Sequence, residues 1–341
     1  MKVDSAVKPS ASPRGEPQND NVIIIKIFFL KMKLNSLILK DKKLFNDFLR
    51  LNRHGLSVYA FENIFIWNRL YDILWRVIDG NLCVFFKDKI GCFLYLAPLG
   101  KKISVQAVEE AFVIMNGYNR NEDISRVENI EEKDVDLFEA WGYKCSVKSH
   151  DYVCTRDSLV DLRGDRFKSK RACCNYFIKN NKFECFDFSL KYGKECLVLY
   201  DLWQGQRKSK TDDKLYQAML EDSKVCLENL LDNYKGLDVI GKIVKVKNPP
   251  CPPFVKGGES RLAAFSFGYE LNPDTFCILY EITDISVKGL AQFIFREFIS
   301  SLKEYKYINI MDDSGLENLK EVKLSYHPEK LVPAYIAVRG K

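Results

Sequence analysis

Apolar and polar positions near the C-terminus predict a strand followed by a helix. Aromatic and β-branched side chains crowd residues 305–310, which is the pattern of a short buried strand. Ser314 is followed three residues later by Glu317, the spacing of a capping box, so we expect a helix to begin at about Gly315. We expect this helix to stop at Pro328, because the residue before a proline is pushed out of the helical region.

The predicted helix carries one lysine on an otherwise apolar face. The residues that recur at the spacing of this face are Leu316, Leu319, Lys323 and Tyr326. A lysine in that setting either extends outward to water or meets an anion. The helix N-terminus, the carboxylates of Asp312 and Asp313 before it and His327 after it favour the second alternative. The two aspartates themselves fit a structural role, since negative charge is stabilised just before a helix N-terminus.

The pattern along the rest of the chain is that of an α/β protein. Predicted strands cover residues 74–78, 82–87, 91–97, 126–130, 152–156, 183–188, 237–246, 261–269 and 275–281. Predicted helices cover residues 41–51, 104–118, 131–141, 195–206, 212–231 and 287–302. Asp79, Gly80 and Asn81 form a hairpin signal between the first two strands. Spacing alone suits several α/β folds.

Residues 1–31 are expected to stand apart from the folded part of the chain. Residues 1–21 are polar and rich in proline, serine and asparagine, which predicts disorder. Residues 22–30 are strongly apolar, but a membrane span needs about twenty residues, so we predict no transmembrane segment. The alternatives for this stretch are an edge strand and a non-native extension, since Met32 opens a stretch that looks like a natural beginning.

Composition narrows the class of protein. A chain of 341 residues with 47% hydrophobic residues can form two domains with a core each. The net charge of +6 favours anionic partners without requiring nucleic acid. Eleven scattered cysteines without a CxxC pair indicate a reducing cytoplasm, and with three histidines no zinc-site spacing can be assembled. We therefore predict neither a disulfide framework nor a metal site.

The C-terminal region also resembles a known family. The residues that carry the resemblance are Asn309, Asp312, Asp313, Gly315, Leu316, Leu319, Lys323 and the run LSYHP at 324–328. They resemble the signature of a bacterial family of unknown function that is related to the catalytic C-terminal domain of phosphatidylglycerol lysyltransferases and, more distantly, to Fem-type aminoacyltransferases. The resemblance implies two tandem GNAT-like (N-acetyltransferase-like) lobes, each a mixed central sheet flanked by helices. We place these lobes at residues 32–156 and 157–341, with the site in the second lobe and at its boundary with the first.

The most basic stretch of the chain opens the second predicted lobe, at residues 157–181. One interpretation is a helix with a solvated basic face. The other, implied by the resemblance, is an anion-binding helix on which Lys168, Arg171 and Asn175 point toward the phosphate of an acceptor or nucleotide. Arginine suits bidentate phosphate recognition, whereas lysine acts as a point charge.

One loop bears on the identity of the acyl donor. In acyl-CoA-dependent relatives of this fold, a Q/R-x-x-G-x-G/A loop holds the pyrophosphate at a helix N-terminus. The matching segment keeps Gly289 and Ala291 but has Ser286 in place of glutamine or arginine. Acetyl-CoA is therefore the less favoured donor, and the lysyltransferase resemblance implies aminoacyl-tRNA. We predict no resident cofactor.

Two glutamates are candidate proton acceptors for acyl transfer, because each ends a predicted strand. They are Glu270 and Glu281, and the alternative for each is an edge-strand carboxylate facing water. Near Glu281 the sequence departs from its family, since Leu279 and Ile282 stand where histidine and lysine are usual. His327 is a further candidate acid or base, with a capping role as its alternative.

These observations lead to one functional hypothesis and two alternatives. We predict transfer of an aminoacyl group from aminoacyl-tRNA to a lipid or small-molecule acceptor in the cytoplasm, with contact to the inner membrane face if the acceptor is a lipid. The residues predicted to bind substrate are Lys168, Arg171, Asn175, Lys323, Tyr326 and His327. The alternatives are a non-catalytic anion-binding protein on the same fold and an acyl-CoA-dependent N-acyltransferase. The sequence selects neither the amino acid nor the oligomeric state.

Overall fold

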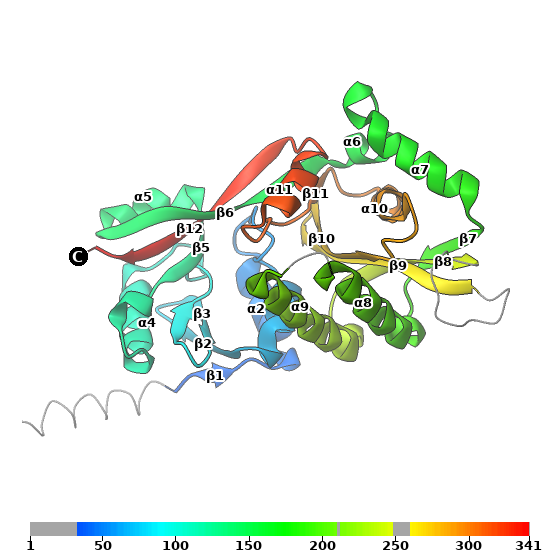
Figure 1. Cartoon of the computed structure of the whole chain (residues 1–341). Coiled ribbons are helices and arrows are strands. Elements are labelled where there is room, and N and C mark those ends of the chain that lie inside the picture. The colour runs from blue at the N-terminus through cyan, green and yellow to red at the C-terminus, as the bar shows by residue number, and fades with distance from the viewer. Residues whose placement is uncertain (1–32, 210–211, 248–259, 341) are drawn as a thin grey trace, which may run out of the picture. The chain divides into compact units, whose positions relative to one another are not determined.

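A computed structural model describes residues 33–209, 212–247 and 260–340, and the chain from Asn35 onward forms one compact unit (Figure 1). The predictions for residues 1–31 lie outside the described residues. Within them, twelve strands form a single mixed sheet in the order β1-β2-β3-β4-β5-β12-β6-β11-β10-β9-β8-β7. Only the pairs β4/β5 and β10/β11 run parallel there, and the other described pairs are antiparallel. The predicted α/β class with a mixed, helix-flanked sheet of GNAT-like type is confirmed.

The strands divide into two runs along the sequence. The first run is β1 (Asn35–Ser36), β2 (Asp72–Ile78), β3 (Asn81–Lys87), β4 (Cys92–Leu94), β5 (Val127–Glu131) and β6 (Tyr143–Thr155). The second run is β7 (Phe183–Asp187), β8 (Val239–Lys247), β9 (Ser260–Asn272), β10 (Thr275–Thr283), β11 (Tyr307–Asn309) and β12 (Lys330–Arg339). The hairpin predicted between β2 and β3 is present, and Asp79 and Gly80 both adopt the positive φ of such turns.

Strand β6 joins the two halves of the sheet. Its C-terminal end pairs with β11 of the second half, and almost its whole length pairs with β12. Strand β12 belongs to the second half of the sequence but lies between β5 and β6 in the sheet. The C-terminal segment therefore completes the first half of the sheet. The lobe boundary placed after residue 156 stays a prediction, and the hydrogen-bonded sheet continues across it.

Helices cover both faces of the sheet. The helices of the first half are α2 (Lys42–Leu49), α3 (Phe61–Phe65), α4 (Val105–Tyr118) and α5 (Glu132–Ala140). Those of the second half are α6 (Arg156–Asp161), α7 (Lys168–Asn180), α8 (Gly193–Lys208), α9 (Lys214–Asn233), α10 (Leu290–Ser301) and α11 (Glu317–Leu324). In the second half, α7 and α10 lie on one side of the sheet, and α8 and α9 lie on the other (Figure 1).

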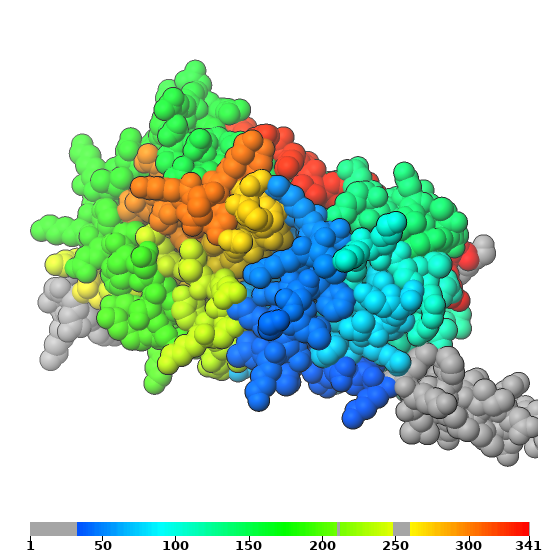
Figure 2. All heavy atoms as spheres, turned by 180° about the vertical axis from the view of Figure 1, so that it is seen from behind, coloured from blue at the N-terminus to red at the C-terminus, as the bar shows by residue number. Residues whose placement is uncertain are grey.

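Alternating side chains on β9 explain this layering. Phe265 and Phe267 belong to the core that includes residues of α8 and α9, whereas Ala264 packs in the core under α10. The larger core extends into the first half, where Asn229 of α9 donates to the carbonyl oxygens of Phe65 and Ile66, each at 3.0 Å. The opposite face of the molecule shows the two halves packed side by side (Figure 2).

The segment before α11 differs from its prediction. The strand expected at 305–310 is β11, but the helix begins at Glu317 and the N-cap Leu316 forms no side-chain cap. The reason is a tight turn in which the carboxylate of Asp313 accepts from the Gly315 amide at 2.9 Å and Ser314 has a φ of 53°. The helix also ends at Leu324, four residues before Pro328.

Candidate functional site

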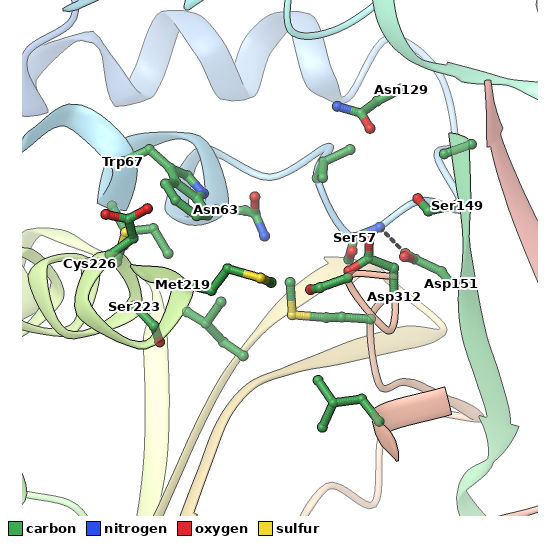
Figure 3. Close-up of a pocket in the computed structure, with 18 of the residues that line it drawn as sticks. Ser57, Asn63, Trp67, Asn129, Ser149, Asp151, Met219, Ser223, Cys226 and Asp312 are labelled. Carbon is green, nitrogen blue, oxygen red and sulfur yellow. Dashed lines mark hydrogen bonds between the residues drawn. The ribbon is translucent and has the colours of Figure 1, made fainter. Parts of the chain in front are cut away.

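A cavity of about 490 Å³ lies between the first and second halves of the chain. Its lining comes from α3 and the 3-10 turn that follows it, strands β5 and β6, helix α9, strand β10 and the loop between β11 and α11 (Figure 3). Because the cavity needs side chains that lie up to about 280 residues apart, its position depends on the packing of both halves.

One end of the cavity is aromatic. The ring side chains that line it are Trp67, Tyr71, Phe86, Phe93 and Tyr95. A buried chain of hydrogen bonds holds the adjoining wall: the Tyr95 hydroxyl donates to Asn63, Asn63 donates to the Tyr269 hydroxyl, and Tyr269 donates to the carbonyl oxygen of Ser57 at 2.6 Å. The buried hydroxyl groups are thus satisfied, and this wall is fixed in position.

The other end of the cavity is acidic. Figure 3 shows Asp151 and Asp312 close together there, while Trp67 and Cys226 lie at the far end. Asp151 accepts from the Ser57 amide at 2.6 Å and from the Asn309 side chain at 2.8 Å. Burial, more than any other cause, raises the pKa of Asp151, and the nearby charge of Asp312 adds to this.

A third carboxylate in the lining is already neutralised. Glu128 lies 2.6 Å from the ammonium group of Lys148 and 2.6 Å from the guanidinium of Arg126. At this end Asp151 and Asp312 therefore remain to attract a cationic group. The lining also includes Asp222 of α9, whose charge acts on Tyr71 of the aromatic end.

Lys323 lies beside the acidic end. Its ammonium group donates to the carbonyl oxygen of Ile310 and lies 6.0 Å from the centre of the Tyr152 ring. Burial lowers the pKa of Lys323, and the charges of Asp312, Asp151, Asp313 and Glu281 oppose that shift. The lysine predicted on the apolar face of the helix therefore extends inward, toward carboxylates.

Glu281 of β10 is not among the lining residues; it follows Tyr280, which is, and the charge of Arg207, which lines the cavity, acts on its carboxylate. Burial raises the pKa of Glu281 to about 7, and the positive charges of Lys170, Lys323 and Arg207 oppose this shift. A carboxyl group with such a pKa can accept a proton near neutral pH and release it again.

Lys170 completes this cluster from α7. Its ammonium group lies 4.0 Å from the centre of the Tyr326 ring, and burial lowers its pKa against the charge of Glu281. Tyr326 is itself buried and packs on Phe295, with ring centres 4.6 Å apart. The structure thus brings together three predicted site residues, Glu281, Lys323 and Tyr326, and adds Lys170.

The other predicted site residues lie elsewhere. Lys168 and Asn175 are exposed on α7, and Arg171 donates to the carbonyl oxygens of Leu162 and Gly164 in the loop before that helix. Glu270 is exposed and accepts from the Tyr305 hydroxyl at 2.7 Å. His327 is exposed with a φ of 52°, and its ring lies edge-on to Phe167 at 5.2 Å. The roles assigned to these residues stay predictions.

The loop matched to acyl-CoA binding is packed against α7. A side chain at Gly289, which has a φ of 82°, would place its first carbon 2.1 Å from the carbonyl oxygen of Cys173. Asp284, just before the loop, accepts from the Ser286 amide at 3.0 Å and from Gln206 at 2.9 Å. Close packing of two helices therefore accounts for the glycine at this position.

Residues 50–338 match the family described as Phosphatidylglycerol lysyltransferase, C-terminal. The chain belongs to this family. Its membership confirms the resemblance carried by the C-terminal signature and supports an acyltransferase. No curated protein matches the chain.

Solved structures with the same fold include both relatives implied by the signature. A conserved protein of unknown function from Bacteroides thetaiotaomicron VPI-5482 is 24% identical, with a TM-score of 0.75 over 90% of this chain and 99% of that one. L-PGS from Bacillus licheniformis is 16% identical, with a TM-score of 0.60 over 88% of this chain and 92% of that one. FemX is 9% identical, with a TM-score of 0.58 over 91% of this chain and 98% of that one.

Two further properties of the described residues concern partners of the site. None of the helices among them has the length and apolar character needed to cross a bilayer. Nor do these residues bring three or more histidine, cysteine, aspartate or glutamate side chains into a cluster that could hold a metal ion.

Sequence reasoning missed most of the cavity. Asp151 and Asn63 carry no local signal, because what makes each of them part of a site is contact with distant segments. Trp67 stands in an aromatic-dense run at residues 57–68, whose rings suit a core better than a ligand site. Lys170 could have been separated from its neighbours on α7, since it falls on the helix face that also carries the apolar Phe167 and Cys174.

Proposed function

We propose that the protein transfers an aminoacyl group from aminoacyl-tRNA to a lipid or small-molecule acceptor, with the aminoacyl group held in the cavity between the two halves. The observation that carries this proposal is the pairing of an aromatic wall with two carboxylates, Asp151 and Asp312, at one end of a single cavity. Every aminoacyl group carries an ammonium group, which such carboxylates attract, and an aromatic wall suits its side chain.

The reaction needs a base and a stabilised oxyanion. The hydroxyl or amine of the acceptor attacks the ester carbonyl of the aminoacyl-tRNA, a new acyl bond forms and the bond to the terminal ribose oxygen breaks. Glu281 takes the proton from the acceptor and returns it to the ribose oxygen, and the Lys323 ammonium stabilises the negative charge on the carbonyl oxygen in between.

Two observations bear on the alternative functions. The packing of Gly289 against Cys173 supports a structural reading of the loop that acyl-CoA-dependent relatives use, and so supports aminoacyl-tRNA over acetyl-CoA. The non-catalytic alternative rests on Leu279 and Ile282, which replace the residues usual in the family. The raised pKa of Glu281 in a cluster with two lysines favours retained catalysis.

The test is a transfer assay with matched carboxylate variants. Bulk tRNA charged with radiolabelled amino acids is incubated with the protein and phosphatidylglycerol vesicles, or with soluble amines, and label is followed into each acceptor. We expect transfer by the wild type, a loss of about 10²–10⁴-fold in Glu281→Gln, and near wild-type rates in the exposed control Glu270→Gln.

Other outcomes would overturn this proposal in distinguishable ways. Transfer from radiolabelled acetyl-CoA but not from charged tRNA would establish the acyl-CoA-dependent alternative. Binding of charged tRNA without transfer to either class of acceptor would favour the non-catalytic alternative. Equal losses in the two glutamate variants would remove Glu281 from the reaction.

A further inference from the structure

A second recess, of about 320 Å³, lies within the first half of the chain. It is formed by residues 52–59, by the loop at 97–103 that precedes α4, and by the first turns of α5. Nothing in the proposed acyl transfer uses this recess.

His54 is the buried polar group of this recess. Its side chain is only 8% exposed, and its ring stacks on Tyr59 with centres 4.1 Å apart. The ring nitrogen Nδ1 lies 2.8 Å from Glu131, a carboxylate that also accepts from the Gly55 amide at 2.7 Å and pairs with Lys133 at 2.6 Å. This arrangement fixes the orientation of the imidazole.

Glu131 determines which nitrogen is available. Burial favours its neutral form, but its hydrogen bond with His54, the charge of that ring and the contacts with Lys133 and Gly55 prevail and lower the pKa of Glu131. An ionised carboxylate can only accept, so the proton of a neutral imidazole lies on Nδ1. The other nitrogen, Nε2, is buried and has no hydrogen-bond partner among the described residues.

An unpartnered buried nitrogen is costly. A ligand group that forms a hydrogen bond with Nε2 would remove this cost. His54 lines the recess, and Glu131, which holds the Nδ1 side of its ring, is not among the lining residues.

Charge selects the class of ligand. The ionisable side chains that line the recess besides His54 and Tyr59 are Lys101, Lys102, Lys133 and Asp134. Lys101 and Lys102 are exposed at the ends of their side chains, whereas Lys133 is shared with Glu131. Lys101 and Lys102 against one lining carboxylate, Asp134, favour an anionic ligand.

We propose that this recess binds the phosphate group of a small molecule, with Lys101 and Lys102 pairing with its oxygens and His54 donating from a protonated Nε2. The volume suits a small ligand, and the buried position of the histidine suits a group that enters a concavity better than a nucleic-acid backbone that runs over a surface. Glu131, on the other side of the ring, holds the imidazole in this orientation.

The histidine itself supplies the readout. The chain has three histidines, so protein labelled with ¹⁵N-histidine gives a spectrum in which His54 is assigned by comparison with His150→Asn and His327→Asn. The wild type is titrated with inorganic phosphate, and separately with sodium chloride at the same ionic strength. We expect phosphate to shift the Nε2 signal of His54 and sodium chloride to leave it in place.

Calorimetry with matched lysine variants tests the partners. We expect Lys101→Ala/Lys102→Ala to weaken phosphate binding at least tenfold. The control Lys89→Ala/Lys303→Ala, which removes the same charge from exposed sites outside the recess, should leave binding unchanged. Glycerol 3-phosphate in place of phosphate separates the sources: tighter binding identifies a phosphorylated metabolite, and equal binding identifies free phosphate.

Two results would overturn the proposal. One is a His54 signal that moves equally with phosphate and with chloride, or with neither. The other is equal weakening in the two double-lysine variants, which would mean nonspecific attraction by net charge. Because neither readout uses aminoacyl transfer, failure of the proposed function leaves this test unaffected.

Discussion

Lys168 and Lys170 are two residues apart on the same helix, and their surroundings are opposite. Lys168 is exposed to solvent, whereas the ammonium group of Lys170 lies over the Tyr326 ring and has a lowered pKa because of burial. Two residues on a helix are separated by about 200° around its axis, so one faces outward and the other faces the core. A basic run in a sequence therefore mixes residues that are solvated with residues that can act in a site.

The two candidate glutamates show the same contrast on adjacent strands. Glu270 on β9 is exposed, while Glu281 on β10 has a pKa raised to about 7 by burial. Both residues lie at the ends of predicted strands, so the sequence alone makes them equal candidates for the proton acceptor. Removal from water, with Lys170 of α7 and Lys323 of α11 among the charges that oppose its effect, is what separates them.

The largest effect we expect is a difference in transfer rate between variants of Lys323 and of Lys168. Lys323→Met keeps the length of the side chain but removes the ammonium group, and should lower the rate of aminoacyl transfer by about 10²–10³-fold, as for loss of one oxyanion donor. Lys168→Met removes an equal charge from an exposed position and should leave the rate unchanged. Equal transfer rates in the two variants, measured on folded protein, would remove Lys323 from the site.

The next effect concerns the cavity itself. Met219 lines it from α9 and points into it in Figure 3, so Met219→Trp should fill part of the space and lower transfer about 10–100-fold. The matched control is Val198→Trp, which adds a similar volume at a side chain that is 70% exposed on α8. If both variants transfer at the wild-type rate, the aminoacyl group binds elsewhere.

Local signals explain which parts of the fold were predictable. The helix at 104–118, the Asp-Gly hairpin and the strands at 261–269 and 275–281 lie within short stretches, and each was predicted and is present. Strand β12 was not predicted, and only the last residues of β6 were, because residues 144–150 are largely exposed and lack an apolar alternation. Their pairing is decided by partners almost 200 residues apart.

The site residues likewise divide into those that the sequence predicted and those that it could not. Lys323 was predicted to meet an anion from the face it shares with Leu319 and Tyr326, and it extends toward carboxylates. Asp151 could not be predicted, because its partners Ser57 and Asn309 lie 94 and 158 residues away in sequence. Sequence periodicity identifies the face of an element, but not what a second element places against it.

A smaller effect should appear in the pH dependence of stability. Folded Glu281 has a pKa of about 7 against 4.5 for its ordinary value, so between these values the folded state binds more protons and stability falls as pH rises. Glu281→Gln cannot titrate. Its unfolding free energy should therefore gain on the wild type between pH 4.5 and 7 and level off above, by at most about 3 kcal/mol at about 1.4 kcal/mol per pH unit.

Chemical denaturation across this pH range measures the difference, and Glu270→Gln is the control. An exposed carboxylate that accepts one hydrogen bond, from Tyr305, should give a difference from wild type that changes little with pH. If the two variants show the same pH profile, the environment of Glu281 is not the desolvated one described above.

The smallest effect we expect concerns Arg171, to which we assign a structural role. Its guanidinium donates to the carbonyl oxygens of Leu162 and Gly164, and Leu162 has a φ of 50°, so the arginine holds the turn between α6 and α7 in an uncommon backbone conformation. Arg171→Met should lower the free energy of unfolding by about 1–2 kcal/mol without changing the transfer rate, since hydrogen bonds to charged groups contribute about that much. Lys168→Met, on the same helix but without these contacts, should leave both quantities unchanged. A loss of transfer in Arg171→Met with unchanged stability would instead support the prediction that Arg171 binds substrate. The outer face of α7 would then be part of the site.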